Sequence, residues 1–273
     1  MDVTLLGSGS PIPDPHRAGP STLVRSGDTA VLVDAGRGVL MRLAASGLFP
    51  VQLSAVLLTH LHSDHITDLN DVITSRWVMS PEPLPLRLIG PPGTQQVVDG
   101  IMAMLAPDIS YRVGHHEDLL QPPQVEVTEV EPGTTFAVDD LEVRVGRTDH
   151  RPVEPTVAYR FEHDGSSLVL GGDGIPCEAL DEICRGADVY VQTVVRDDLI
   201  SQVPMQRLVD ILDYHSSVAD AGRTAARAGV GTLVLTHQVP SMAPGDEGTW
   251  RDQAAAHFDG TVVVGDDLTT VAV

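Results

Sequence analysis

The sequence predicts an α/β protein in which two β-sheets pack face to face and helices cover both outer sides, a four-layer αββα sandwich. The 273 residues, 42% of them hydrophobic, can fill one large α/β domain or two small ones. Short strand patterns come first, alternating strand and helix patterns follow, and this order occurs twice along the chain. No linker, low-complexity tract or short-period repeat interrupts the pattern. We therefore expect a single domain over residues 1–273.

The first half of the chain begins with apolar strand patterns. A hairpin is predicted where "SGDT" separates two β-rich runs. Proline and glycine in "GPPGT" mark the start of a helix. In this half, strands are predicted at Val3–Leu6, Ser21–Arg25, Ala30–Asp34, Leu53–Thr59 and Leu86–Ile89, and helices at Val39–Gly47, Ile66–Met79 and Thr94–Leu105.

The second half repeats the order, with strand patterns first and alternation afterwards. "DGSS" joins two of its strands as a tight turn, and "SSVAD" offers serine and aspartate side chains that can cap a helix. Strands are predicted at Val125–Val130, Thr135–Val138, Leu141–Arg147, Val157–His163, Ser167–Leu170, Val189–Thr193, Leu233–Thr236 and Thr261–Val264, and helices at Cys177–Arg185, Met205–Asp213, Val218–Gly229 and Thr249–Phe258.

The composition restricts the class of protein. The formal net charge is −21, and all 17 basic residues are arginine, which we attribute to genome composition. Such an acidic chain is a poor electrostatic match for nucleic acid, so a polyanionic substrate needs a locally positive site, which bound metal can supply. Cys177 and Cys184 are expected to be reduced thiols. The sequence shows no secretion signal and no apolar stretch long enough for a membrane helix, so we expect a cytoplasmic protein.

Histidine and aspartate concentrate in "LLTHLHSDHITDL", which begins at Leu57 directly behind an apolar run. In an extended segment, side chains two residues apart point the same way, so His60 and His62 can bind one ion together. Asp64 and His65 offer an oxygen and a nitrogen toward a second point. Zinc, manganese and iron all accept imidazole and carboxylate ligands. A pair of metal ions therefore needs further ligands from elsewhere in the chain.

Three other residues follow apolar strand patterns directly, and we nominate them as these further ligands: His150, Asp173 and His237. Strand ends are where a rigid scaffold presents functional side chains to a cleft. A lone histidine after a strand is usually a surface or turn residue. Three such strand ends, combined with the histidine cluster, instead favour a metal site.

The motif "THLHSDH" resembles the HxHxDH signature of the metallo-β-lactamase superfamily, and within it the chain is similar to the ribonuclease Z branch. "LLGSGSPIPDPHRAGPSTLV" resembles the opening strand, glycine turn and second strand of that branch, and "VDAGRG" resembles its hairpin. "GGDGIPC" resembles its GDT segment, with Gly174 in place of threonine. "YHSSVADAG" resembles its HST segment, and "LTHQVP" its last ligand loop. The resemblance runs nearly from end to end of the chain.

This resemblance implies a four-layer metallo-β-lactamase fold and a homodimeric hydrolase with two metal ions, zinc or alternatively manganese or iron. The ions would lie about 3.5–4 Å apart and share a hydroxide that attacks a phosphodiester. The family's substrate is the 3′ trailer of precursor tRNA. The implied ligands are His60, His62 and His150 for one metal, Asp64, His65 and His237 for the other, and Asp173 as the bridge. Asp64 also corresponds to the aspartate that orients or deprotonates the water.

His215 is the second candidate catalytic residue. It precedes a predicted helix whose first residues include Ser216 and Ser217, and a helix N-terminus with hydroxyl groups attracts phosphate. His215 would stabilise the phosphorane oxygens or protonate the leaving group, or else only cap the helix. Asp34 and Asp68 are candidates for orienting the metal-bound histidines, although Asp34 is as compatible with a simple turn.

The remaining histidines carry no functional prediction. His115 and His116 lie in a polar stretch that is expected to be a solvated loop. His16, His163 and His257 have no supporting neighbours, and Asp149 is compatible with a turn.

Two departures from the ribonuclease Z pattern bear on the substrate. The tRNA-clamping arm of that branch lies between the third histidine and the bridging aspartate, but here a short hairpin joins His150 to Asp173. Gln192 stands where many members have a glutamate. An alternative is therefore a small-ester hydrolase of the same fold, acting on an aryl sulfate, cyclic nucleotide or lactone. A further alternative is a metal-bound regulatory protein without turnover, which the complete ligand set disfavours.

Overall fold

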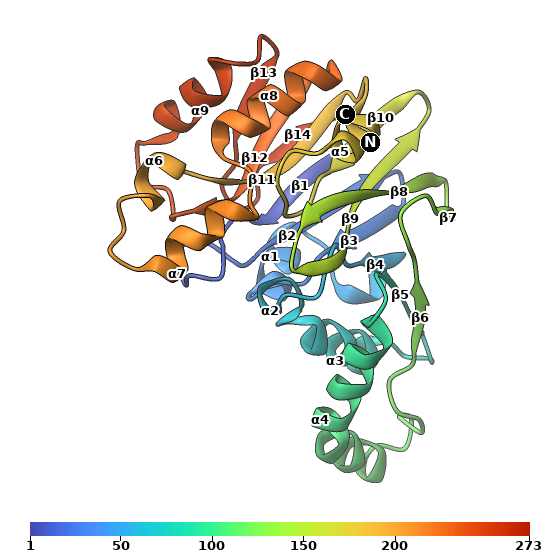
Figure 1. Ribbon diagram of the computed structural model, residues 1–273. Helices are drawn as coiled ribbons and strands as arrows, with labels where there is room; N and C mark the ends of the chain where they lie inside the picture. The colour runs from blue at the N-terminus through green and yellow to red at the C-terminus, as the bar shows by residue number, and fades with distance from the viewer.

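The computed structural model describes residues 1–273 and contains two seven-stranded sheets with helices on both outer sides (Figure 1). The strand order is β14-β1-β2-β3-β4-β5-β6 in the first sheet and β13-β12-β11-β10-β9-β8-β7 in the second. The predicted αββα architecture is confirmed.

The first sheet and its helices come mainly from the first half of the chain. Its strands are β1 (Asp2–Gly7), β2 (Ser21–Ser26), β3 (Thr29–Val33), β4 (Ala55–Leu57), β5 (Leu86–Gly90), β6 (Val125–Glu129) and the C-terminal β14 (Thr270–Ala272). The helices of this half are α1 (Val39–Ala45), η1 (Pro50–Gln52), α2 (Ser63–Ile66), α3 (Leu69–Met79) and α4 (Thr94–His115).

The second sheet follows the same plan. Its strands are β7 (Thr135–Val138), β8 (Leu141–His150), β9 (Val153–His163), β10 (Ser166–Leu170), β11 (Val189–Val195), β12 (Thr232–Val239) and β13 (Thr261–Val264). Its helices are α5 (Glu178–Cys184), α6 (Asp197–Ile200), α7 (Gln206–Val209), η2 (Asp210–Asp213), α8 (Val218–Ala228) and α9 (Glu247–Ala255).

The two sheets share one pairing pattern. In the first sheet, the pairs from β14 to β3 are antiparallel and those from β3 to β6 are parallel. In the second sheet, the pairs from β7 to β10 are antiparallel and those from β10 to β13 are parallel. Parallel strands need crossover connections, which explains why helices appear only in the later part of each half.

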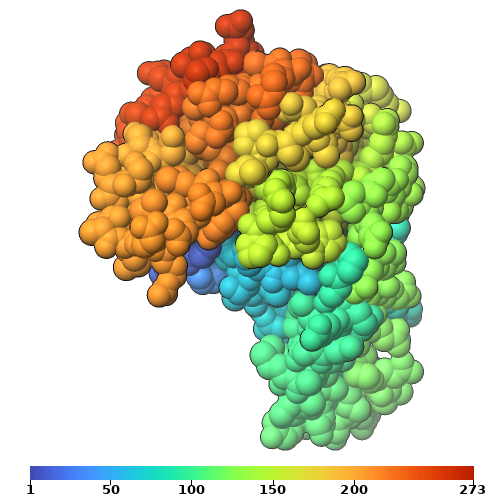
Figure 2. Space-filling view, viewed as in Figure 1, coloured from blue at the N-terminus to red at the C-terminus, as the bar shows by residue number.

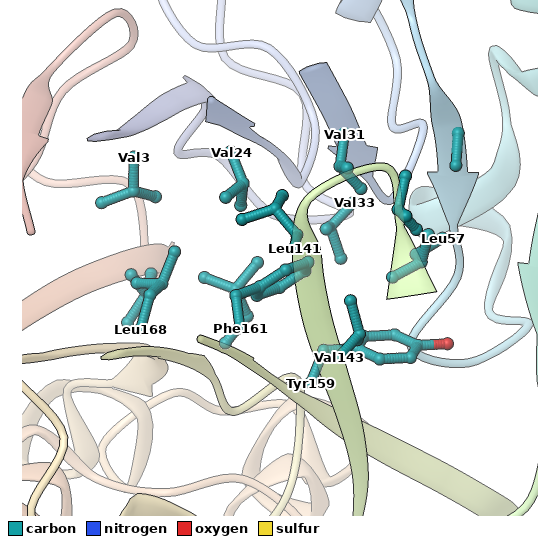
Figure 3. Close-up of a cluster of buried hydrophobic side chains, with 14 of the residues drawn as sticks. Val3, Val24, Val31, Val33, Leu57, Leu141, Val143, Tyr159, Phe161 and Leu168 are labelled. Atoms are coloured by element: carbon teal, nitrogen blue, oxygen red, sulfur yellow. The ribbon is translucent and has the colours of Figure 1, made fainter. Parts of the chain in front are cut away.

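Three apolar clusters separate the four layers. The largest, of 21 buried residues, lies between the sheets and includes the side chains labelled in Figure 3: Val3, Val24, Val31, Val33 and Leu57 from the first sheet, and Leu141, Val143, Tyr159, Phe161 and Leu168 from the second. One further cluster lies between the first sheet and helices α1, α3 and α4, and another between the second sheet and α5, α8 and α9. Valine and leucine dominate the cluster between the sheets and the cluster beneath α1, α3 and α4, whereas alanine is the commonest residue beneath α5, α8 and α9.

The structure differs from the predicted elements in several places, one of them the helix predicted at Met205–Asp213, which is divided into α7 and η2. The helix predicted at Ile66–Met79 begins only at Leu69, as α3, and the separate short helix α2 precedes it, because Asp68 hydrogen-bonds the Asp34–Gly38 loop between them. The helix predicted to end at Leu105 continues to His115 through Pro107, at an exposed position where water can satisfy the carbonyl that loses its partner. The short elements η1, α6 and β14 were not predicted.

Helix α4 projects away from the sandwich and forms the lower lobe of the molecule (Figures 1 and 2). His115 therefore ends a helix rather than lying in the predicted loop. No helix of the structure combines the length and apolar character that crossing a bilayer requires.

Candidate metal centre

The predicted site residues gather at one edge of the two sheets. His60 and His62 follow β4, His150 ends β8, Asp173 follows β10, and His237 lies near the end of β12. On the surface, the yellow-green turn after β8, the orange segment around α7 and the cyan segment around α2 lie side by side (Figure 2). Carboxyl ends of neighbouring parallel strands meet at one edge of a sheet, so residues distant in the sequence converge there.

The first group of side chains comprises His60, His62, His150 and Asp173, whose candidate ligand atoms lie within 4.8 Å of one another. Nδ1 of His62 is 3.0 Å from Nε2 of His60 and 3.2 Å from Nε2 of His150. All but His62 are buried. Three nitrogens and one oxygen at this separation form a four-ligand set of the kind that zinc accepts.

The second group comprises Asp64, His65 and His237, all of them buried. Oδ2 of Asp64 lies 3.3 Å from Nε2 of His237 and 3.6 Å from Nε2 of His65. This group provides two nitrogens and one oxygen. It therefore matches a second, adjacent cation.

One oxygen connects the two groups. Oδ2 of Asp173 is 3.4 Å from Nε2 of His65 and 3.6 Å from Nε2 of His237 in the second group. The same oxygen is 3.8 Å from Nε2 of His60 and 4.0 Å from Nε2 of His150 in the first group. Asp173 therefore lies between the groups, in the place that a bridging carboxylate requires.

Hydrogen bonds behind the rings fix the orientation of three histidines. Nδ1 of His65 donates to Oδ2 of Asp34 across 2.7 Å, and Nδ1 of His150 donates to the carbonyl of Tyr214 across 2.8 Å. Nδ1 of His60 donates to Oγ1 of Thr59 across 3.0 Å. With the proton on Nδ1, each ring presents the Nε2 lone pair to the centre, as metal-binding histidines do.

Two residues of the centre have strained backbones. Asp34 has a φ of 62° and His237 a φ of 49°, in the left-handed region that non-glycine residues rarely adopt. The Gln238 N–H, next to His237, donates to the carbonyl of Ser8 across 3.0 Å and helps hold this backbone. Such conformations cluster at functional sites, where the surrounding structure enforces them.

In the metal-free protein, the histidines of the two groups have pKa values shifted in opposite directions. Burial lowers the pKa of His150 to about 4 and the pKa of His60 well below its ordinary value. Burial also disfavours a charge on His65 and His237, but nearby carboxylates, Asp173 above all, outweigh it and raise the pKa of both rings. The same contacts hold the pKa of the Asp173 carboxyl well below its usual range despite its burial.

The residues fit divalent metal ions. Nε2 of His60 and of His150 both present lone pairs toward Nδ1 of His62, which carries at most one proton to share between them, whereas a cation among the three nitrogens satisfies all of them. Nε2 of His65 and Oδ1 of Asp173 are buried without any hydrogen-bond partner in the protein. Buried polar atoms without partners are costly, and metal coordination is one way of satisfying them.

His215 lies beside the centre. Its Nε2 is 3.3 Å from Oδ2 of Asp173, and its Nδ1 is 3.0 Å from the carbonyl of Ile211. Because a carbonyl only accepts hydrogen bonds, Nδ1 carries the proton. The structure therefore directs Nε2 of His215 at the candidate metal site.

The two serines after His215 do not have the predicted arrangement for binding phosphate. The Ser216 hydroxyl is buried and donates to the carbonyl of Gly174 across 2.7 Å. The Ser217 hydroxyl accepts from the N–H of Asp220 and donates to its carboxylate, so it caps α8. Both hydroxyls have internal partners, which leaves neither free for a ligand.

The two predicted orienting aspartates differ. Asp34 contacts His65, as predicted, whereas no hydrogen bond joins Asp68 to a histidine. The Asp68 carboxylate instead accepts from the N–H of Gly38 and supports the loop before α1. The sequence did not single out Thr59, which links Asp34 to His60, although it directly precedes the first histidine of the motif.

Other singled-out residues lie away from the centre or have structural partners. Asp149 pairs with Arg151 on the surface, and His163 lies near Asp140 and Asp164. Gln192 is buried on β11, and no hydrogen bond joins it to His215.

Comparisons with known proteins identify the family of the chain. A family model described as the beta-lactamase superfamily domain matches residues 29–238. Ribonuclease Z of Mycolicibacterium gilvum (strain PYR-GCK) is 56% identical over 275 residues, which cover 100% of this chain and 96% of the relative. Ribonuclease Z of Mycobacterium bovis (strain BCG / Pasteur 1173P2) is 55% identical, covering 100% and 98%. The chain belongs to the ribonuclease Z branch of the β-lactamase superfamily. It is therefore a metal-dependent hydrolase acting on phosphodiester bonds.

Solved structures give the same fold. Human tRNase Z, short form, superposes with a TM-score of 0.72 at 21% identity, covering 100% of this chain and 99% of that one. The metallo-β-lactamase fold protein YhfI from Bacillus subtilis superposes with a TM-score of 0.75 at 22% identity, covering 99% and 98%. At these identities the likeness extends to the fold alone.

The missing arm does not separate this chain from its ribonuclease Z relatives. The alignments cover 96% and 98% of the two relatives and all of this chain. A long inserted segment between His150 and Asp173 would leave a large part of such a relative unmatched. The compact connection is therefore shared with proteins named ribonuclease Z.

Proposed function

We propose that the protein is a ribonuclease Z that cleaves the 3′ trailer from precursor tRNA, using two divalent cations held by one domain of residues 1–273. The observation that carries this proposal is the position of Oδ2 of Asp173, within 4.0 Å of four histidine nitrogens from both groups. A carboxylate in this place neutralises and spaces two adjacent cations. The names of the full-length relatives support RNA as the substrate.

The ligands would be His60, His62 and His150 for one ion, Asp64, His65 and His237 for the other, and Asp173 for both. Five imidazoles and two carboxylates favour zinc, and they also accept manganese or iron. When bound, such cations polarise phosphoryl oxygens and lower the pKa of a coordinated water. They also supply the positive charge that an acidic chain needs in order to approach a polyanion.

Asp64 has a second role in this proposal. Burial alone would raise the pKa of its carboxyl, but contacts with His237 and His65 lower it, so the carboxylate is ionised at neutral pH. It can orient the attacking water and accept its proton. General-base assistance of this kind contributes about 10²–10⁴-fold to a rate.

His215 is proposed as the proton donor to the leaving oxygen. Its Nδ1 proton is bonded to the Ile211 carbonyl, which fixes the ring while Nε2 faces the centre. A proton on Nε2 can therefore be transferred to the oxygen that leaves phosphorus. The expulsion of a ribose alkoxide requires such a proton.

We further propose that the enzyme is a cytoplasmic homodimer. Exposed large apolar side chains occur at the end of α3, on α4 and in the loops that follow these two helices: Val78, Met79, Leu84, Met104, Tyr111 and Leu120. Apolar groups on a projecting lobe are suited to a partner surface. Sedimentation of the full chain checks the oligomeric state.

A second candidate substrate is a small phosphodiester. The net charge of −21 favours it, because RNA binding normally depends on many cationic contacts. Most arginines of the chain are also paired with carboxylates, including Arg17, Arg42, Arg144, Arg151 and Arg196. A small ester needs only the metal centre itself.

One experiment separates these possibilities. The metal content per chain is measured on the purified protein, and the same sample is assayed on bis(p-nitrophenyl) phosphate and on a precursor tRNA with a 3′ trailer. Two ions and cleavage of the tRNA at the trailer junction support the proposal. Two ions with turnover of the small diester only would assign the site to the second candidate. A chain that binds no metal would overturn both.

A further inference from the structure

Gln192 lies in the middle of β11 and is 1% exposed, on the side of the second sheet that faces the helices. Its Nε2 is 3.1 Å from the carbonyl of Gly172, 3.0 Å from the carbonyl of Thr193 and 3.2 Å from Oγ1 of Thr193. Its Oε1 accepts a hydrogen bond from the Tyr190 hydroxyl. The amide is therefore satisfied as donor and as acceptor within the protein.

The carbonyl that Gln192 binds belongs to the residue directly before Asp173. The Thr193 hydroxyl donates to the same Gly172 carbonyl across 2.9 Å, so two side chains of β11 hold one peptide oxygen. Gly172 has a φ of 67°, in the region that favours glycine. The peptide plane at Gly172 sets where the following residue points its side chain.

Gln192 also packs against Gly171, the residue before Gly172. A Cβ atom added to Gly171 would lie 2.3 Å from Oε1 of Gln192 and 2.9 Å from Cε2 of Tyr190. The glutamine and tyrosine side chains thus fill the space beside Gly171 that a side chain there would occupy. The turn that carries Asp173 therefore packs against the side-chain amide of Gln192.

Position 192 requires a side chain that can donate hydrogen bonds, as the glutamine amide does. The group facing Gly172 must donate hydrogen bonds, and two carbonyl oxygens lie within 3.1 Å of Nε2. An ionised glutamate only accepts, so its oxygens would repel both carbonyls in a buried place. Gln192 is also not positioned to exchange protons with His215, whose Nδ1 is held by Ile211.

We infer that Gln192 is a positioning residue for the metal centre, which acts by fixing the Gly172 carbonyl and thereby aiming the Asp173 carboxylate between the two histidine groups. Gln192 is thus not the remnant of a catalytic acid. The inference rests on the proposed role of Asp173 as a metal ligand.

The test measures Zn²⁺ affinity of the full-length metal-free protein by competition with a chromophoric chelator. Gln192→Met keeps the length of the side chain and removes both donors. We expect it to weaken Zn²⁺ binding by about 10–100-fold, the usual effect of losing a group that supports a ligand. Tyr190→Phe is the matched control, because it removes a hydrogen bond of the same buried cluster without touching the Gly172 carbonyl. Its Zn²⁺ affinity should equal that of the wild type.

Equal losses in Gln192→Met and Tyr190→Phe would overturn the inference, because they would indicate a general loss of packing. Thr193→Val removes the other hydrogen bond to Gly172 and keeps the test decisive if Gln192→Met does not fold. Gln192→Glu distinguishes positioning from acid catalysis. We expect weaker Zn²⁺ binding and a lower kcat on bis(p-nitrophenyl) phosphate, whereas a higher kcat at unchanged affinity would overturn the inference. Failure of the wild type to bind Zn²⁺ would instead contradict the proposed function.

Discussion

Asp34 accepts a hydrogen bond from Nδ1 of His65 across 2.7 Å, although 31 positions separate the two residues. The same carboxylate accepts from the N–H and the hydroxyl of Thr59, each across 2.8 Å. Because the Thr59 hydroxyl donates its proton to Asp34, its oxygen is free to accept from Nδ1 of His60. One carboxylate therefore orients a histidine of each group, one directly and one through a threonine.

Replacing Asp34 should weaken both metal sites. Asp34→Asn suits the left-handed backbone, since asparagine tolerates a positive φ, but it replaces a carboxylate oxygen by an amide nitrogen. We expect Zn²⁺ affinity to fall by about 10–100-fold at both sites, measured by chelator competition. Asp68→Asn is the matched control, because Asp68 binds only the loop before α1, and the affinity should then stay at the wild-type level. An unchanged affinity in Asp34→Asn would refute the orienting role.

Metal loading and catalysis should separate between two variants. His215→Ala should still bind two ions, because His215 is proposed as a proton donor and not as a ligand. Its kcat on a substrate with a poor leaving group should fall by about 10²–10⁴-fold. Asp64→Ala should lose an ion and its activity together. Metal analysis of both purified variants beside the kinetics checks this, and a His215→Ala protein with wild-type kcat would reduce His215 to a structural residue.

Zinc binding should release protons mainly from the second group. In the metal-free protein, His65 and His237 have raised pKa values, so these rings keep their protons to higher pH than His150, whose pKa is about 4. A metal ion competes with those protons, so affinity at the second group should decline as the pH falls through the raised pKa values. Affinity at the first group should persist to lower pH.

Calorimetric titration with Zn²⁺ near pH 7, in two buffers that differ in ionisation enthalpy, measures the protons released. Release that persists undiminished in His65→Ala would contradict the assignment of those protons to the second group. The control is His62→Ala. Burial lowers the pKa of His62, so its ring is mostly deprotonated at that pH and contributes little to the proton release.

The two cysteines should differ in reactivity. Cys184 is fully buried in the cluster beneath α5 and α8, and burial raises the pKa of its thiol, which disfavours the reactive thiolate. Cys177 is half-buried at the start of α5. A disulfide reagent should modify Cys177 in the native protein and both thiols after denaturation. Cys177→Ser should leave the native protein unreactive, and rapid native labelling of Cys184 would show that the helix layer opens readily.

The sequence predicted those features of the site that depend on local patterns. Five of the seven nominated metal ligands follow an apolar strand or lie at or near its end, and strands that run in the same direction bring such ends together at one edge of a sheet. The histidine motif also defined two directions of approach, and the structure separates His60 and His62 from Asp64 and His65 in this way.

The interpretations that failed depend on contacts distant in the sequence. The Ser216 hydroxyl donates to the carbonyl of Gly174, and the Asp68 carboxylate accepts from the N–H of Gly38. The residues next to Ser216 and Asp68 in the sequence do not indicate either partner. Gln192 shows the same limit, because its role is visible only when β11 lies beside the turn that carries Asp173. The extension of α4 past Pro107 reflects exposure, which local propensity does not encode.

The two halves of the chain, each with its own sheet and helices, are joined by residues 130–134 and by the return of β14 to β1. Neither half contains a complete set of ligands. His60, His62, Asp64 and His65 come from the first, and His150, Asp173 and His237 from the second. Each cation would therefore link the two halves across their interface. Its binding free energy would include the cost of bringing one half against the other. A small separation of the two halves, even by a fraction of an ångström, would lower metal affinity before it unfolded either half.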